Sequence, residues 1–246
     1  MFIRRMLLKI SEMKLKLYII AFFAFSISLL NAQDIDHSLW TKILQEHVSD
    51  NGNVNYKSIK ANKIELDHYL HQLSENAPKD TWSRNELLAY WINTYNAFTI
   101  KLIIDNYPIN SIKDLKSPWD KRFIKIGNKL VSLNYIEHDV LRKMKEPRIH
   151  FAIVCASYSC PKLLNKAYES SILEEQLTTA TKSFLTDTSK NNISKNEVQL
   201  SKIFKWFDKD FLTVGTLTDF LNNYSVETIS KNAKIGYKNY NWDLNE

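Results

Sequence analysis

The stretch SRNELLAYWINTYNAFTIKLIIDN, residues 83–106, decides the fold class of this chain. Ser83, followed three positions later by Glu86, forms the capping-box signature with which many helices begin. Pro108 prevents the helix from continuing. Apolar side chains recur at helical spacing along the whole stretch and form a wide stripe. We therefore expect one long helix, from Ser83 to Asn106, at the centre of the molecule.

Shorter helices and a few strands are expected around this central helix. Helical spacing of apolar residues predicts helices within residues 36–49, 58–75, 134–144, 170–186, 204–211 and 217–229. Strand-like patterns lie in the second half of the chain: a hairpin across Gly127-Asn128, a buried strand at 149–154, a short turn between 193–194 and 198–200, and a strand or an extended arm at 235–242. The expected class is α+β, a helix-rich single domain with a small mixed or antiparallel sheet in the second half.

The composition is that of a globular protein. Of the 246 residues, 44% are hydrophobic and 24% are charged, which excludes a largely disordered chain. Only four glycines and five prolines are present, so a collagen-like or low-complexity protein is also excluded. No linker-like segment divides the chain, and we expect residues 33–246 to form a single globular domain.

Residues 1–32 have the pattern of a secretory signal peptide. Lys14 and Lys16 precede a short apolar run, residues 17–30, and the small residue Ala32 stands just before Gln33. The run is shorter than the roughly 20 residues that a membrane-spanning helix needs. We expect export to the periplasm or the extracellular space, with no membrane span in the mature chain. An uncleaved N-terminal anchor is the alternative.

The basic net charge does not point to nucleic acid. The formal charge of the chain is +6, and most of this surplus comes from the lysines and arginines of the predicted signal peptide. The remaining chain is nearly balanced, and a basic surface patch is not indicated. We expect no nucleic-acid partner.

Two cysteines follow the apolar segment that ends at Val154. Cys155 and Cys160 enclose a loop of small and polar residues, and Pro161 follows. Reactive groups are often held on loops at the ends of rigid elements, so a functional thiol at Cys155 is one interpretation. An inert buried cysteine and a Cys155–Cys160 disulfide, which an exported protein would retain, are the others.

A nucleophilic cysteine needs a base, and two histidines are candidates. His150 is close in sequence, but five residues of strand span roughly 16 Å, and positions 150 and 155 would face opposite sides. His138, in a separate short helix, is therefore the preferred base. Glu137 is a candidate to orient it, although adjacent helical positions diverge by about 100°.

Two amides lie on one face of the central helix. Asn93 and Asn96 are three positions apart, and buried amides require hydrogen-bond partners. They could orient a histidine or donate to a substrate carbonyl, or they could tie down neighbouring backbone. The spacing of Cys155, Cys160 and the histidines is not that of a common zinc module, and no nucleotide-binding motif is present. We expect no metal and no cofactor.

Four motifs occur in order along the chain: Tyr90–Ala97, Ser132–His138, Arg148–Pro161, and Leu200–Phe207 with Asp210-Phe211. Together they resemble the family called domain of unknown function 547, over about residues 80–212. The family carries no established activity. The resemblance implies only that its shared motifs include Asn93, Asn96, Glu137, His138, His150, Cys155 and Cys160.

Two functional hypotheses follow. The first is a thiol-dependent hydrolase or acyltransferase of the cell envelope, with Cys155 as nucleophile, His138 as general base, and Asn93 or Asn96 assisting the base or the oxyanion. The second is a non-catalytic exported binding or scaffold domain, in which Cys155 and Cys160 are paired or buried. The partner is an unidentified cell-envelope substrate or protein in either case.

Overall fold

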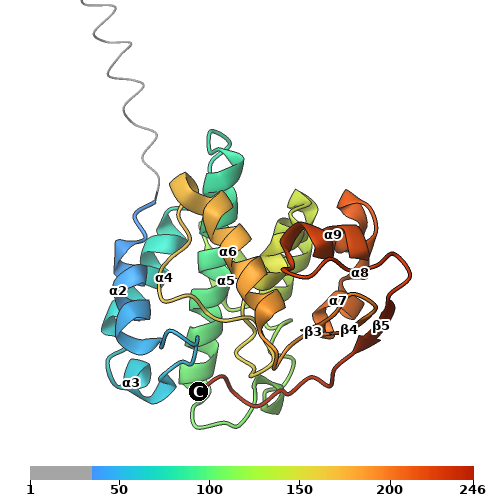
Figure 1. The fold of residues 1–246 in the computed structure, drawn as a ribbon. Coiled ribbons are helices and arrows are strands. Elements are labelled where there is room, and N and C mark those ends of the chain that lie inside the picture. Colours follow the sequence, from blue (N-terminus) through green and yellow to red (C-terminus); the bar gives the residue numbers. More distant parts are fainter. Residues whose placement is uncertain (1–34) are drawn as a thin grey trace, which may run out of the picture.

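The central helix of the fold is α5, Arg84–Asn106. A computed structural model describes residues 35–246, and the predicted signal peptide lies outside this range. The predicted capping box is present, because Ser83 and Glu86 each accept a hydrogen bond from the backbone of the other. Figure 1 shows α5 in the middle of the molecule, with other helices on several sides. Most of its side chains from Leu88 to Ile104 are buried, so this helix organises the core.

Three N-terminal helices pack beside α5. They are α2 (Ser38–His47), α3 (Tyr56–Ala61) and α4 (Ile64–Glu75). The helix expected over residues 58–75 is therefore two helices. The break lies at Asn62, whose backbone N–H donates to the carbonyls of Ser58 and Ile59 and ends α3. Burial of both helices against the core outweighs the continuous helical spacing of the sequence.

The predicted hairpin is confirmed. Strands β1 (Ile124–Ile126) and β2 (Lys129–Val131) pair antiparallel, with Ile126 opposite Lys129. Gly127 has a φ of 55°, the left-handed conformation that a two-residue turn requires. Its N–H donates to the carbonyl of Ser74 at 2.8 Å, which ties the hairpin to the end of α4.

A second, three-stranded sheet lies in the last quarter of the chain. Its strands are β3 (Asn192–Ile193), β4 (Glu197–Leu200) and β5 (Lys234–Tyr237), in that spatial order. The β3–β4 pair is antiparallel and the β4–β5 pair is parallel. The helix-rich α+β class with a small mixed sheet in the second half is thus confirmed.

The helices around this sheet enclose a second group of buried apolar residues. They are α6 (Leu173–Thr186), which follows the short 3-10 turn η5 (Ser170–Ile172), then α7 (Ile203–Trp206), α8 (Asp208–Phe211), the 3-10 turn η6 (Leu212–Val214) and α9 (Leu217–Tyr224). Five phenylalanines dominate the group: Phe151, Phe184, Phe204, Phe211 and Phe220. Helix α9 ends before the predicted boundary at Ile229.

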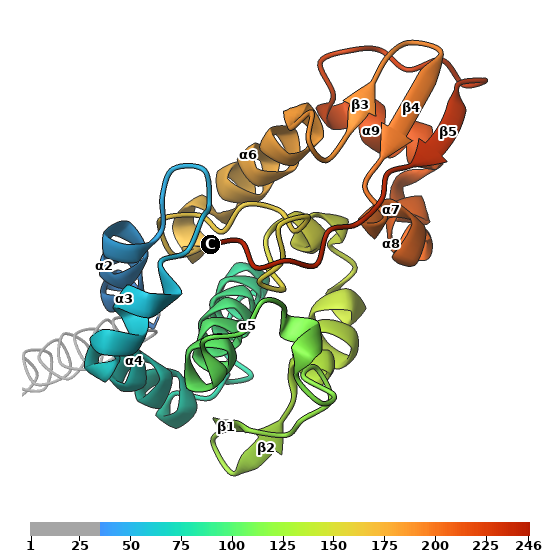
Figure 2. The same ribbon diagram turned by 90° about the horizontal axis from the view of Figure 1, so that it is seen from below.

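After β5 the chain runs back across the molecule as an extended arm, which confirms the arm expected from the sequence. Figure 2 shows the arm passing from the sheet to the N-terminal helices. The N–H of Leu244 donates to the carbonyl of Asn110 at 2.9 Å, and the N–H of Val54 donates to that of Asn245 at 2.8 Å. The arm thereby joins segments that are far apart in sequence.

The buried strand predicted at residues 149–154 is wrong. The segment begins instead as a 3-10 helix, η4 (Pro147–Phe151), with Pro147 in its first turn. The N–H groups of Ala152 and Ile153 both donate to the carbonyl of Ile149, so they do not pair with another strand. This chain bend changes where His150 and the cysteine loop point.

Candidate functional site

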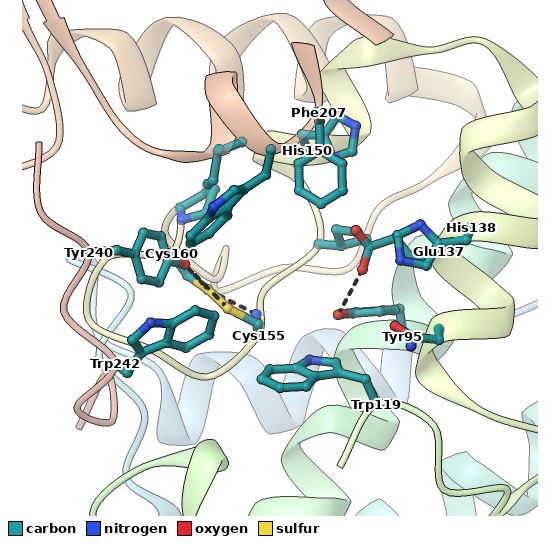
Figure 3. Close-up of a pocket in the computed structure, with 15 residues that line it drawn as sticks. Tyr95, Trp119, Glu137, His138, His150, Cys155, Cys160, Phe207, Tyr240 and Trp242 are labelled. Carbon is teal, nitrogen blue, oxygen red and sulfur yellow. Dashed lines mark hydrogen bonds between the residues drawn. A yellow bond between two sulfur atoms is a disulfide. The ribbon is translucent and has the colours of Figure 1, made fainter. Parts of the chain in front are cut away.

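A cavity of about 220 Å³ lies where the central helix, the 135–144 segment, the cysteine loop and the C-terminal arm meet. Figure 3 shows its side chains arranged around an open centre, with the two sulfur atoms at its edge. Its lining consists of Tyr95, Trp119, Asn134, Glu137, His138, His150, Ile153, Cys155, Cys160, Pro161, Ile203, Trp206, Phe207, Tyr240 and Trp242. The fold thus brings together Glu137, His138, His150 and both cysteines.

Cys155 and Cys160 form a disulfide. Cys155 is partly exposed, whereas Cys160 is only 5% exposed. Three donors surround the sulfur of Cys160: the N–H of Cys155 at 3.0 Å, the hydroxyl of Ser157 at 3.3 Å and the hydroxyl of Tyr240 at 3.3 Å. The sulfur of Cys155 contacts the same two hydroxyls, each at 3.4 Å. In this oxidised form Cys155 has no thiol to act as a nucleophile.

The C-terminal arm holds the loop between the two cysteines. The N–H of Tyr158 donates to the carbonyl of Asp243 at 2.6 Å, and the N–H of Ser159 donates to that of Asn241 at 3.1 Å. Ala156 has a φ of 59°, so the chain turns sharply directly after Cys155. Backbone pairing with the arm therefore positions the sulfur atoms, and Tyr240 comes to them from the same arm.

Glu137 is a buried carboxyl group in the wall of the cavity. It lies on η2 (Tyr135–Leu141), a π-helix, and such helices are rare and frequent at functional sites. Burial raises the pKa of Glu137 to about 7, although the hydrogen bond from the hydroxyl of Tyr95 and the charge of Arg142 oppose the shift. A carboxyl group with this pKa can accept or donate a proton near neutral pH.

His138 is on the same π-helix but faces a different partner. Nη1 of Arg142 donates to its Nδ1 at 2.9 Å, and burial together with this guanidinium lowers the pKa of the imidazole. Among the hydrogen bonds of Cys155 none goes to His138. In the view of Figure 3, the carboxyl group of Glu137 lies between the disulfide and the His138 ring. The hydrogen-bond partner of Glu137 is Tyr95 and that of His138 is Arg142, so no hydrogen bond joins these two neighbours.

His150 belongs to an ionic network at the edge of the cavity. Its Nε2 lies 2.8 Å from Oδ2 of Asp210, and Arg142 donates to both oxygens of the same carboxylate, at 2.6 and 3.0 Å. The ring stacks on Phe207, with 4.1 Å between centroids. Burial raises the pKa of Asp210, but the hydrogen bonds from His150 and Arg142 outweigh it and leave this pKa well below its usual range. The network fixes the ring of His150.

The two amides of the central helix bind backbone and do not line the cavity. Asn93 donates to the carbonyl of Tyr168 at 2.8 Å and accepts from its N–H at 2.9 Å. Asn96 donates to the carbonyl of Ala152 and accepts from the N–H of Val154, each at 2.9 Å. These contacts match the alternative in which the amides tie down neighbouring chain. Asn96 is a positioning residue, because it holds the backbone that leads into Cys155.

Sequence reasoning missed the aromatic part of the site. Trp206, Tyr240 and Trp242 pack against one another, with 4.6–5.7 Å between ring centroids, and Trp119 meets Trp242 edge to face at 5.8 Å. The abundance of aromatic residues in the C-terminal tail was the available signal. The pairing of the arm with the cysteine loop is what brings these rings to the sulfur atoms.

The comparison with protein families covers most residues of this cavity. Residues 79–185 match the family described as "Protein of unknown function, DUF547". Over this segment the chain is similar to the DUF547 family. The DUF547 segment supplies Tyr95, Glu137, both histidines and the disulfide, whereas the rings of Trp206, Tyr240 and Trp242 lie beyond it. Comparison with curated proteins and with solved structures gave no match.

Two further findings concern metal binding and membrane spanning in the described residues. Within residues 35–246, no group of three or more histidine, cysteine, aspartate or glutamate side chains is arranged to hold a metal ion. No helix in the same range is long and apolar enough to cross a membrane.

Proposed function

We propose that this cavity is the active site of a thiol–disulfide exchange enzyme, with Cys155 as the sulfur that reacts with substrate. The difference between the two sulfur atoms carries the proposal. Cys155 is the more accessible, and Cys160 is buried among three hydrogen-bond donors. Hydrogen bonds to a thiolate stabilise it, and a stabilised thiolate leaves faster in exchange.

The reaction requires only a substrate dithiol or disulfide. A substrate thiolate attacks Sγ of Cys155, the bond between the two cysteines breaks, and Cys160 leaves as a thiolate that takes up a proton. The second substrate thiolate then attacks the substrate sulfur of this mixed disulfide and displaces Cys155. Two electrons pass from the substrate, which becomes a disulfide, to the enzyme, which becomes a dithiol. In the reverse direction the enzyme dithiol reduces a substrate disulfide.

Glu137 is the proton acceptor in this proposal. Thiolates react and thiols do not, so an incoming thiol must lose a proton inside the cavity. The carboxyl group of Glu137 lines the same cavity, and with a pKa of about 7 it is ionised in part at neutral pH. A base with such a pKa takes up the proton and releases it to solvent afterwards.

Reduction of a small disulfide by dithiothreitol, followed with and without the protein, tests the proposal. We expect acceleration by the wild-type protein and none by Cys155→Ser. Cys160→Ser, reduced, freed of dithiothreitol and then mixed with the small disulfide, should accumulate a mixed disulfide with the substrate at Cys155, visible by mass spectrometry. The chain has only these two cysteines, so each variant is unambiguous. A native disulfide that resists dithiothreitol would refute the proposal and favour the non-catalytic scaffold.

A second candidate is the thiol-dependent hydrolase or acyltransferase, with reduced Cys155 as nucleophile and His138 as base. The shared cavity of Cys155, Glu137 and His138 favours it. It requires reduction of the disulfide and movement of the His138 ring away from Arg142. Reduced protein mixed with p-nitrophenyl acetate should then give a burst of p-nitrophenol that both Cys155→Ser and His138→Ala abolish. A burst that survives His138→Ala would exclude His138 as the base.

Export is part of the proposal, because disulfides persist outside the cytosol. The predicted signal peptide, residues 1–32, supports it. N-terminal sequencing of the mature protein should give a start near Gln33. A mature chain that retains residues 17–30 would favour the uncleaved anchor instead.

A further inference from the structure

Aromatic side chains form the largest group around the disulfide, and the lining includes no lysine or arginine. Six of the fifteen cavity residues carry aromatic rings other than imidazole: Tyr95, Trp119, Trp206, Phe207, Tyr240 and Trp242. The acidic side chain of the lining is Glu137. An anionic group in the cavity would therefore meet this carboxylate, whose charge Arg142 offsets only from outside the lining.

The aromatic wall touches the reacting atoms directly. The hydroxyl of Tyr240 lies 3.4 Å from Sγ of Cys155, and the Tyr240 ring packs on Trp206 at 4.7 Å and on Trp242 at 4.6 Å. Trp119 and Trp242 line the same cavity as the disulfide, as Figure 3 shows. A substrate sulfur that reaches Cys155 must lay its neighbouring atoms against these rings.

Trp206 extends this wall to the surface. It lines the cavity and is nevertheless 44% exposed, so it stands where a substrate enters. Exposed large aromatic side chains beside a pocket favour contact with another flat apolar group, because ring pairs attract beyond the area they bury. The cavity volume of about 220 Å³ leaves room for such a ring.

We propose that the preferred substrates are thiols or disulfides whose sulfur is carried by an uncharged aromatic group, and that Trp206 and Trp119 determine this specificity. The inference rests on the proposed exchange activity and adds the substrate class. The same chemistry is offered by a small benzyl-type thiol and by a protein cysteine that lies between aromatic residues. Acidic thiols should be poor substrates.

The test measures second-order rate constants for reduction of the protein disulfide by four thiols: benzyl mercaptan, 2-mercaptoethanol, 3-mercaptopropionate, and a blocked peptide with cysteine between two phenylalanines. Each rate constant is divided by the rate constant of the same thiol with hydroxyethyl disulfide, which corrects for the intrinsic reactivity of the thiol. Benzyl mercaptan should exceed 2-mercaptoethanol by about tenfold, the size expected for one aromatic pair, and 3-mercaptopropionate should be slowest. A higher relative rate for the peptide than for benzyl mercaptan would indicate that protein cysteines are the substrate. A higher relative rate for benzyl mercaptan would indicate small-molecule thiols.

Trp206→Ala and Trp119→Leu should each remove most of the preference for benzyl mercaptan. Tyr237→Ala is the matched control, because this aromatic residue is 36% exposed but does not line the cavity. It should keep the preference. Equal relative rates for benzyl mercaptan and 2-mercaptoethanol with wild-type protein would overturn the inference and leave the exchange activity intact.

A binding measurement distinguishes failure of the aromatic substrate site from failure of the proposed exchange activity. The Cys155→Ser/Cys160→Ser double variant cannot exchange, and benzyl methyl sulfide cannot react. Binding of benzyl methyl sulfide to this double variant is followed by tryptophan fluorescence. Adding Trp206→Ala to the double variant should weaken this binding, and adding Tyr237→Ala should not. If binding depends on Trp206 in this way but the disulfide of the wild-type protein does not react with thiols, the aromatic site is supported and the exchange activity is refuted. Absence of binding would overturn the aromatic site itself.

Discussion

The hydroxyl of Tyr95 donates a hydrogen bond to Oε2 of Glu137 at 3.3 Å, and both side chains line the cavity that contains the disulfide. This single long hydrogen bond does not compensate for the burial of the carboxyl group, whose pKa rises to about 7. Helix α5 therefore contributes to the chemistry of the site through Tyr95 and to its framework through Asn96.

Glu137 should make the protein less stable as the pH rises. Its folded pKa of about 7 exceeds the ordinary value of 4.5, so the folded state holds the proton more tightly. The contribution of Glu137 to the free energy of unfolding therefore falls as the pH rises from 4.5 to about 7, and it no longer changes at pH values well above 7. Glu137→Gln should gain about 2–3 kcal/mol relative to wild type between pH 5 and pH 8, measured by urea unfolding. Glu75→Gln, at an exposed site, should retain the wild-type pH dependence. If the free energy of unfolding of Glu137→Gln changed with pH in parallel with that of the wild type, the prediction would be contradicted.

The same carboxyl group should shape the rate of disulfide exchange. Only its ionised form accepts a proton, so the rate of reduction by a monothiol should rise through pH 7 more steeply than ionisation of the thiol alone explains. Glu137→Gln should lose this additional rise and keep the dependence on the thiol. Stopped-flow tryptophan fluorescence between pH 5.5 and 8.5 measures both. An unchanged profile in the variant would remove Glu137 from the mechanism.

After reduction, Cys155 should be alkylated before Cys160. Cys155 is partly exposed and Cys160 is 5% exposed, so access of the reagent decides the order. Iodoacetamide followed by peptide mass mapping should show modification at Cys155 at least about ten times faster. The unreduced protein is the control and should not react, since both sulfur atoms are in the disulfide. Faster labelling of Cys160 would reverse the proposed roles.

Asn96→Ala should destabilise the protein strongly. The variant leaves the carbonyl of Ala152 and the N–H of Val154 buried without their partner, at a cost of about 2–4 kcal/mol. Asn232→Ala, at an exposed position, is the matched control and should leave the unfolding curve unchanged. Chemical denaturation measures both variants. A loss below about 1 kcal/mol in Asn96→Ala would mean that the backbone finds other partners.

Asp210→Asn should loosen the network around His150. The carboxylate accepts from Nε2 of His150 and from Arg142, but it is 20% exposed, and solvent screening limits the loss to about 1 kcal/mol at pH 7. The His150 ring, no longer hydrogen-bonded to a carboxylate, should show a changed NMR titration. Asp139→Asn, at an exposed pair with Lys143, should change neither quantity. An identical His150 titration in Asp210→Asn would contradict the role of the network.

Local sequence signals were sufficient where the deciding contacts are local. The capping box of Ser83 and Glu86 and the turn at Gly127 join residues within a few positions of one another, and both were predicted. The strand prediction for the segment before Cys155 was wrong because the side chain that holds this segment, Asn96, is 56 and 58 residues away from the groups it binds. Periodicity of apolar residues could not distinguish a buried strand from a buried 3-10 turn of this length.

The sequence alone determined the central helix, the α+β class and the membership of the cysteine and histidine motifs in one family. Which of these side chains meet was decided by the tertiary structure. The C-terminal arm pairs with the cysteine loop and carries Tyr240 and Trp242 to the sulfur atoms, and the π-helix points Glu137 to Tyr95 and His138 to Arg142. The contacts of Tyr240 with Cys155 and of Tyr95 with Glu137 depend on hydrogen bonds and packing between segments about 40 to 85 residues apart, for which no local pattern exists.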